Sequence, residues 1–189
     1  DAGGQDVRAG AGLASTVLAQ GKATEAAAIL DDVLARVPDA EKPRVHSQRL
    51  MTLQYDANIT PAELADAHRQ WDQRHGLAMR DHWRPWTNDR DPHRRLRLGF
   101  PSADFRAHPV GLLLFGVLAA LNPAEFDVVL YRDGHDRDLG TERFECLPAC
   151  LRRVARLPDP ALADLVRQDN IDILFDLAGH TAAGRPLLF

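Results

Sequence analysis

The stretch LRLGFPSADFRAHPVGLLLFGVLAAL, residues 96–121, contains the pattern that decides the fold. Residues 96–102 form a short, mainly apolar run that predicts a β-strand, and residues 109–121 predict an apolar helix that begins at a proline. The loop between them carries two charged residues and a histidine, His108. A strand, a polar loop and a helix in this order are typical of the first half of a βαβ unit.

The same alternation continues to the end of the chain. Further strands are predicted over residues 126–133, 151–157 and 171–179. Further helices are predicted over residues 138–150 and 160–168, and Asp159 is expected to cap the second of them. The order βαβαβαβ predicts an α/β fold in which a Rossmann-like parallel sheet carries helices on both faces. Its strands are mostly apolar, as strands buried on both sides should be.

The chain before the first strand has a different residue pattern, which is typical of helices. Residues 1–80 are rich in Ala, Leu, Glu, Gln and Arg at helical spacing. Within residues 7–40, the key positions of one tetratricopeptide repeat are matched by Leu13, Ala14, Gly21, Ala26, Leu30, Leu34 and Pro38. The small residues let two antiparallel helices approach, the glycine turns the chain, and the proline ends the second helix. A generic helical hairpin is the alternative. Because one repeat cannot bury its apolar face alone, further repeats are expected before Asp1.

The start of another helix is marked by three residues that match its cap, its first position and its third position: Thr60, Pro61 and Glu63. Beyond this start, His68 and His75 recur at helical spacing with Trp71. We expect both histidines to be structural, either as partners of a buried Trp71 or as part of a solvated face.

The helical region and the α/β region are joined by a polar segment with two prolines, which predicts a linker over residues 81–95. The expected organisation is therefore a helical, tetratricopeptide-like region over residues 1–80, the linker, and a Rossmann-like region over residues 96–189. The chain begins on Asp1 and stops on an apolar stretch, so we expect it to be a piece of a longer protein.

Composition argues against several kinds of function. The net charge of −4, from 27 acidic and 23 basic residues, argues against a nucleic-acid scaffold. No apolar run approaches the roughly 20 residues that a membrane-spanning helix needs. Cys146 and Cys150 lack the second pair that a zinc site requires, so we expect reduced thiols and no metal. Few cysteines and no signal peptide indicate a reducing compartment, the cytoplasm.

Two polar loops are expected at the carboxyl edge of the sheet, where such sheets bind ligands. One loop, residues 102–111, follows the first strand, and the other, residues 179–185, follows the fourth. These two strands are neighbours in the common doubly wound order, so the loops should face each other. Neither loop contains a GxGxxG or Walker motif, so a nicotinamide or P-loop function has no support.

Each loop offers candidate functional residues. His108, just before a helix, can take a proton from a hydroxyl or donate one to a phosphate oxygen, and a helix cap is the alternative. In the second loop, His180 and Thr181 lie between Gly179 and Gly184, which suits a close approach of the backbone to a ligand. A plain turn is the alternative there.

Four segments together resemble the O-linked N-acetylglucosamine transferase family. They are LRLGFPSADFRAHPVGLLL, EFDVVLYRDG, NIDILFDLAGHTAAGRPLLF and, before them, YDANITPAELADAHRQWDQRHG, a stretch found in bacterial, Spindly-like members. The resemblance covers roughly residues 45–189, and the repeat-like segment agrees with the tetratricopeptide superhelix of the family. Because several separate motifs occur in order, the combination is specific.

The resemblance implies a two-lobed GT-B glycosyltransferase. Members of the family move a sugar, usually from UDP-GlcNAc, to Ser or Thr hydroxyls of proteins, with inversion, without a metal and without a further cofactor. The family's histidine near the acceptor and the sugar matches His108, with Pro109 after it. Ala107 replaces the asparagine that often precedes this histidine, which removes one hydrogen-bonding side chain. Asp104 and Arg106 are expected to support the loop rather than to contact a substrate.

The family's loop near the donor phosphates matches Gly179, His180 and Thr181. The second lobe, which holds most of the nucleotide, would begin well after Phe189, so we expect this chain to be inactive alone. The expected partners are protein acceptors, through the helical repeats, and a nucleotide sugar, with neither nucleic acid nor membrane. Two alternatives remain: a GDP-fucose-dependent protein O-fucosyltransferase, and a non-catalytic, repeat-based protein-binding module.

Overall fold

The computed structural model describes residues 2–189, with side chains from Arg8 onwards. It divides into two compact units. The first unit extends to Trp83 and also contains His180–Ala182, and the second comprises Arg84–Gly179 and Ala183–Phe189.

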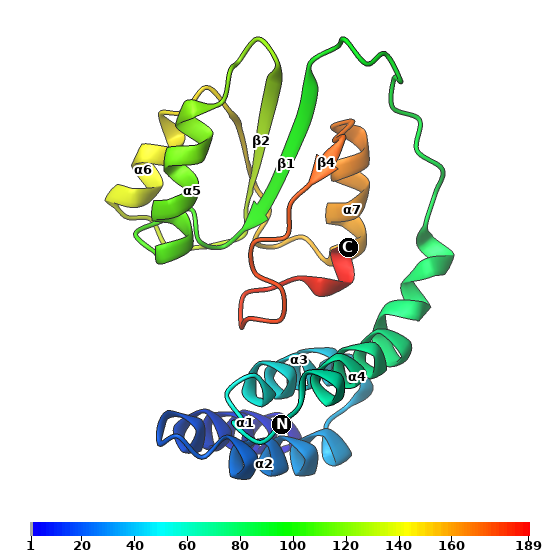
Figure 1. Ribbon diagram of the computed structural model, residues 1–189, viewed down its shortest axis with the longest axis vertical. Coiled ribbons are helices and arrows are strands. Elements are labelled where there is room, and N and C mark those ends of the chain that lie inside the picture. The colour runs from blue at the N-terminus through cyan, green and yellow to red at the C-terminus, as the bar shows by residue number, and fades with distance from the viewer. Residues whose placement is uncertain (1) are drawn as a thin grey trace. The chain divides into compact units, whose positions relative to one another are not determined.

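The first unit is helical (Figure 1). Its α-helices are α1 (Ala2–Ala19), α2 (Ala23–Arg36), α3 (Lys42–Leu53) and α4 (Pro61–Trp71). Shorter helical turns are η1 (Asp39–Glu41), η3 (Leu77–His82) and the π-helical η2 (Asp72–Gly76).

Helices α1 and α2 form the hairpin that the repeat-like segment predicts. Gly21 adopts a left-handed conformation, with φ of 80°, at the turn between them, which favours glycine. Ala14 and Ala26 are fully buried, so the two helices approach closely. Leu13, which matches the leucine position of the repeat, is 54% exposed in this hairpin. The neighbouring Ala14 occupies the buried face of α1 instead, and residues one apart on a helix point in different directions.

The predicted start of α4 is confirmed in full. Thr60 accepts a hydrogen bond from the backbone N–H of Glu63 at 3.2 Å, and the Glu63 carboxylate accepts one from the backbone N–H of Thr60 at 2.8 Å. Pro61 occupies the first helical position, where its missing N–H costs no hydrogen bond. This reciprocal pair satisfies two donors that the helix itself leaves unpaired.

The second unit contains a parallel sheet with the strand order β3-β2-β1-β4. Its strands are β1 (Leu96–Ser102), β2 (Phe126–Arg132), β3 (Cys150–Arg153) and β4 (Ile173–Leu174). The predicted pairing of the first and fourth strands is confirmed. The predicted fourth strand, 171–179, was too long, because Asp176 accepts hydrogen bonds from the backbone N–H groups of Ala178 and Gly179 and turns the chain out of the sheet.

The helices of the second unit are α5 (Pro109–Ala120), α6 (Leu139–Glu145) and α7 (Asp159–Gln168), and a short turn, η4 (Pro186–Leu188), follows them. The predicted helix over 138–150 is shorter than expected: it ends at Glu145, before Pro148, and the next strand begins at Cys150. The third strand ends at Arg153 rather than at residue 157. Asp159 does not cap α7 but is its first residue, after Pro158 at the cap position.

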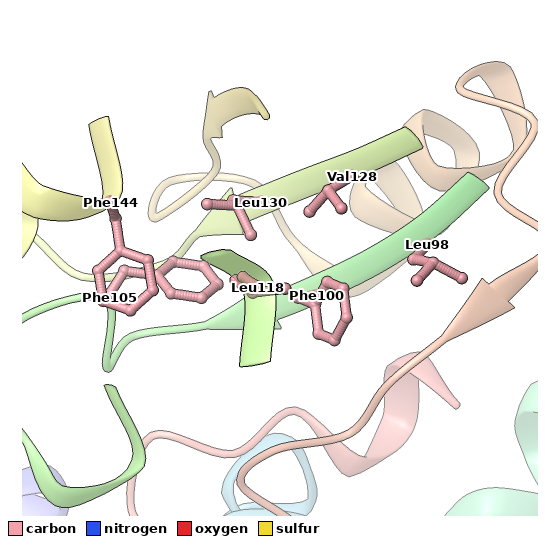
Figure 2. Close-up of a cluster of buried hydrophobic side chains, with 7 residues drawn as sticks. All are labelled: Leu98, Phe100, Phe105, Leu118, Val128, Leu130 and Phe144. Carbon is pink, nitrogen blue, oxygen red and sulfur yellow. The ribbon is translucent and has the colours of Figure 1, made fainter. Parts of the chain in front are cut away.

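Helices cover both faces of the sheet, as predicted (Figure 1). On the α5–α6 face, seven buried side chains form one core: Leu98, Phe100, Phe105, Leu118, Val128, Leu130 and Phe144 (Figure 2). On the α7 face, the alternate residues of β2, Val129 and Tyr131, pack against Leu162 and Val166. Successive side chains of a strand point to opposite faces, so one apolar strand supplies both cores. The carboxyl ends of β1, β2 and β4 are thereby held at one rigid edge.

The segment before β1 is fixed to the second unit through Asp172. The Asp172 carboxylate accepts two hydrogen bonds from the Arg94 guanidinium, at 2.5 and 2.6 Å, and one from the Asn88 amide at 2.6 Å. These bonds, that of Arg94 above all, hold the pKa of Asp172 well below its usual range. Much of the segment predicted as a linker thus has a defined position against the sheet.

Candidate active site

The loop that follows β1 is fitted closely against three glycines. A Cβ atom on Gly111 would overlap the carbonyl oxygens of Asp104 and Arg106, and one on Gly140 would overlap the backbone at Ala107. A Cβ on Gly134 would lie 2.8 Å from the carbonyl oxygen of Ala103. Contacts this short with backbone atoms cannot be relieved by a rotamer change. The loop therefore depends on glycine at these positions for its shape.

Backbone hydrogen bonds fix the same loop internally. The N–H of Arg106 donates to the carbonyl of Asp104 at 2.7 Å, and the N–H of His108 donates to the carbonyl of Arg106 at 2.8 Å. The N–H of Ala107 donates to the carboxylate of Asp138 at 2.9 Å, which ties the loop to the start of α6. The chain before His108 is thus preorganised by its own backbone.

His108 caps α5. Its backbone is extended, Pro109 follows at the first helical position, and its ring Nδ1 accepts a hydrogen bond from the backbone N–H of Val110 at 3.3 Å. The same Nδ1 lies 3.4 Å from a carboxylate oxygen of Asp104. The side chain remains 34% exposed. The cap that was the structural alternative for His108 is therefore present, although the side chain is still partly exposed.

Asp104 and Arg106 contact each other within the loop. Asp104 is buried, and its other carboxylate oxygen lies 3.4 Å from the Arg106 guanidinium. Its backbone N–H donates to the hydroxyl of Ser102 at 3.0 Å. Both residues therefore have local partners that support the loop.

The loop that follows β4 is divided between the two units. Gly179, in the second unit, adopts a left-handed conformation with φ of 52° in the turn that Asp176 forms. His180 and the exposed Thr181 belong to the first unit. There, the Nδ1 of His180 lies 2.9 Å from the hydroxyl of Ser47.

His180 joins an aromatic cluster in the first unit. Its ring centroid lies 4.7 Å from that of Trp71 and 5.1 Å from that of His68. Trp71 is buried and also contacts His75, at 5.4 Å between ring centroids. The expectation that His68 and His75 lie near a buried Trp71 matches this arrangement. No sequence pattern predicts the contact of His46, whose Nδ1 lies 3.1 Å from the Nε2 of His75, since His46 comes from another helix.

Burial of His46 leads to a pH prediction. The ring is 3% exposed, and burial, aided by the nearby His75 and Arg74, lowers its pKa from 6.5 to about 4. A histidine pKa that is lower in the folded state gives stability that is complete above about pH 6.5 and is lost as the pH falls toward about 4. Lowering the pH from about 7.5 to about 5 should therefore cost the wild type roughly 2 kcal/mol more than His46→Gln. Urea denaturation at both pH values measures this difference. The control is His135→Gln at an exposed histidine, which should follow the wild type.

Arg185, in the loop after β4, is a residue that the sequence analysis did not single out. Its guanidinium donates to both carboxylate oxygens of Asp133, at 2.7 and 3.0 Å, to the carboxylate of Asp159 at 3.1 Å, and to the carbonyl of Leu157 at 2.8 Å. Asp133 directly follows β2, and Asp159 begins α7. Arg185 therefore anchors the end of the second loop to two other elements of the unit. The motif GHTAAGR included this arginine, but its partners are 52 and 26 residues away.

Within the part of the chain that the structure describes, no group of three or more His, Cys, Asp or Glu residues could hold a metal ion. Cys146 and Cys150 are free and exposed. Among the described residues, no helix is long and apolar enough to cross a membrane.

Known proteins with a similar sequence and fold are glycosyltransferases. No protein-family model matches the chain. It is 28% identical over 148 residues to a probable UDP-N-acetylglucosamine–peptide N-acetylglucosaminyltransferase SPINDLY of Petunia hybrida, and 30% identical over 148 residues to that of Oryza sativa subsp. japonica. Each alignment covers 76% of this chain and 16% of the plant protein.

A solved structure, that of a mutant of the Thermobaculum terrenum O-GlcNAc transferase, superposes with a TM-score of 0.87. It is 31% identical in sequence, and the superposition covers 96% of this chain and 34% of that one. The fold, a helical part followed by a parallel α/β sheet, is thus that of a glycosyltransferase of this type. The chain belongs to the O-linked N-acetylglucosamine transferase family, as the resemblance of its motifs predicted, and spans only part of the length of these relatives.

Proposed function

We propose that this chain is part of an inverting, metal-independent protein O-glycosyltransferase that moves GlcNAc from UDP-GlcNAc to Ser or Thr hydroxyls. The observation that carries the proposal is the preorganised loop after β1, which presents a partly exposed His108 at the carboxyl edge of the sheet in a member of this family. The close fit of this loop against three glycines holds its backbone in one conformation. A catalytic side chain requires such a fixed position.

In the proposed reaction, the acceptor hydroxyl attacks the anomeric carbon as UDP departs on the opposite side. His108 orients that hydroxyl or takes its proton. Thr181 and the backbone N–H groups of residues 179–184, with His180 beside them, help to hold the pyrophosphate, whose negative charge grows as it leaves. Asp104, Arg106 and Pro109 support the loop that carries His108.

The regions predicted from the sequence have separate roles in this proposal. Residues 1–80 are a tetratricopeptide-like end of a repeat array that binds protein acceptors, and residues 81–95 connect it to the catalytic region. Residues 96–189 are the first lobe of a GT-B enzyme, whose second lobe binds most of the nucleotide, so this chain is inactive alone. The enzyme acts in the cytoplasm.

The test is donor turnover by the full-length protein. UDP-GlcNAc and GDP-fucose are supplied separately, and nucleotide release and labelling of host proteins are followed. We expect UDP release with labelled protein, lowered about 100-fold or more in His108→Ala. His135→Ala, at an exposed histidine of the same unit, is the matched control and should retain the wild-type rate. GDP release alone would assign the protein to fucose transfer, and inactivity with both donors would favour a protein-binding module.

A further inference from the structure

The ring of His180 lies in the first unit, against side chains of two helices. Its Nδ1 is 2.9 Å from the hydroxyl of Ser47 in α3, a hydrogen bond in which either group can be the donor. The ring makes a T-shaped contact with Trp71, at an interplanar angle of 72°, and a tilted one with His68, at 48°. Both of these aromatic partners belong to α4. One nitrogen and two ring contacts of His180 are thus used by α3 and α4.

The hydroxyl of Ser47 has a partner far away in the chain. In a helix, a Ser or Thr hydroxyl ordinarily donates to the carbonyl four residues earlier. Three residues of α1 and α3 do so: Ser15, Thr16 and Thr52. For Ser47 that carbonyl would be the one of Pro43, which accepts a hydrogen bond from the indole N–H of Trp71 at 3.2 Å. The Ser47 hydroxyl is paired with His180, 133 residues further along the chain.

The residues around this ring are themselves fixed by the helices. Ser47 and Trp71 are both buried. Besides its bond to Pro43, Trp71 contacts the ring of His75, whose Nε2 lies 3.1 Å from the Nδ1 of His46 in α3. None of these contacts involves the loop after β4. The helices α3 and α4 therefore offer a rigid site to a ring that the loop supplies.

The loop after β4 is held at three points. Asp176 forms the turn at Gly179, the ring of His180 is bound by α3 and α4, and the guanidinium of Arg185 is paired with two carboxylates. Residues 181–184, TAAG, carry one exposed hydroxyl and otherwise only small side chains. Such a segment leaves its backbone N–H groups open to an anion. Because both of its ends are fixed, it needs little further ordering when a ligand binds.

We propose that His180 is a positioning residue, which fixes the backbone of residues 179–184 for the donor pyrophosphate through its contacts with Ser47 and Trp71. The ring itself does not contact the nucleotide sugar. This inference rests on the proposed function and deepens it, because it assigns a role in donor binding to two residues of the helical region.

Nucleotide binding by the full-length protein tests this role. UDP and GDP are titrated into the wild type by calorimetry, and the one that binds more tightly is used for the variants. Ser47→Ala removes one hydrogen bond and should weaken binding about threefold or more. His180→Ala removes the ring contacts as well and should weaken it about tenfold or more. Since Ser47 acts through the ring of His180, the double variant should bind no more weakly than His180→Ala.

The matched control for this titration is Thr52→Val. It removes a buried hydroxyl of the same helix, one that donates to the carbonyl of Gln48, and should leave the nucleotide affinity unchanged. Wild-type affinity in a folded Ser47→Ala variant, or additive effects of Ser47→Ala and His180→Ala, would overturn the inference and leave the proposed function intact. Failure of the wild type to bind either nucleotide would overturn both.

The chemical reactivity of the ring tests whether the donor touches it. Diethyl pyrocarbonate acylates neutral histidine rings, and mass spectrometry of the full-length protein locates each modified residue. We expect Ser47→Ala to raise the rate at His180 about threefold or more, because the ring is then held less firmly. A saturating concentration of the nucleotide should leave the wild-type rate at His180 unchanged, and the exposed His135 should react equally in every case. Protection of His180 by the nucleotide would show that the ring contacts the donor and would overturn the proposal, as would an unchanged rate in Ser47→Ala.

Discussion

Gly111→Ala is expected to lower the free energy of unfolding by about 3 kcal/mol and to abolish the sugar transfer that we propose for the full-length protein. Gly111 is the third residue of α5, where alanine would normally stabilise a helix. Here the added Cβ would overlap the carbonyl oxygens of Asp104 and Arg106. Because both atoms belong to the backbone, the loop itself must move, and the cap of His108 must move with it.

The matched control lies in the same helix. Gly116 is exposed, and none of the described residues would come within 4 Å of a Cβ added there. Gly116→Ala should therefore stabilise the protein by about 0.5 to 1 kcal/mol, as expected for a helix interior. Urea denaturation of both variants, followed by circular dichroism, provides the comparison. Similar behaviour of the two variants would show that the close fit of the loop on Gly111 has no energetic consequence.

The features that the sequence predicted correctly depend on neighbouring residues. The capping box at Thr60 and Glu63 needs only residues three apart, and the β1–α5 unit follows from a change of apolar period within 26 residues. The pairing of β1 with β4 followed from a general rule of doubly wound sheets. In each case, local chemistry or a common topology was sufficient.

The features that the sequence analysis did not predict depend on contacts between residues far apart in the chain. Leu13 and Ala14 are adjacent in the sequence, and Ala14 is the one that is buried, against Leu30 and Val33 of α2. The length of β4 is limited by a turn at Asp176, whose hydrogen bonds outweigh the strand propensity of the apolar residues around it. His46 and His75 meet although 29 residues separate them. A single sequence contains no signal for such pairs.

Arg185→Met is the second substitution with a large expected effect. The side chain of Arg185 is 17% exposed and that of Asp133 is 14% exposed, so the substitution would leave a largely buried carboxylate without its cation. Removing one partner of such a pair costs about 3 kcal/mol or more, although the pair itself contributes less than that. The loop after β4 would also lose its anchor. If this loop holds the donor as we propose, the full-length protein should bind the nucleotide sugar more weakly, with KM raised more than kcat is lowered.

A double-mutant cycle separates the ion pair from the rest of the arginine. Asp133→Asn alone should destabilise the second unit, and the double variant should be less destabilised than the sum of the single variants by about 1.5 kcal/mol or more. Arg156→Met, at an exposed arginine three residues before α7, is the control and should change stability by less than about 0.5 kcal/mol. Additive effects of Arg185→Met and Asp133→Asn would mean that Arg185 holds the loop through Asp159 and Leu157 alone. Because Asp133 directly follows β2 and Asp159 begins α7, the cycle also tells whether the end of β2 or the start of α7 positions the loop.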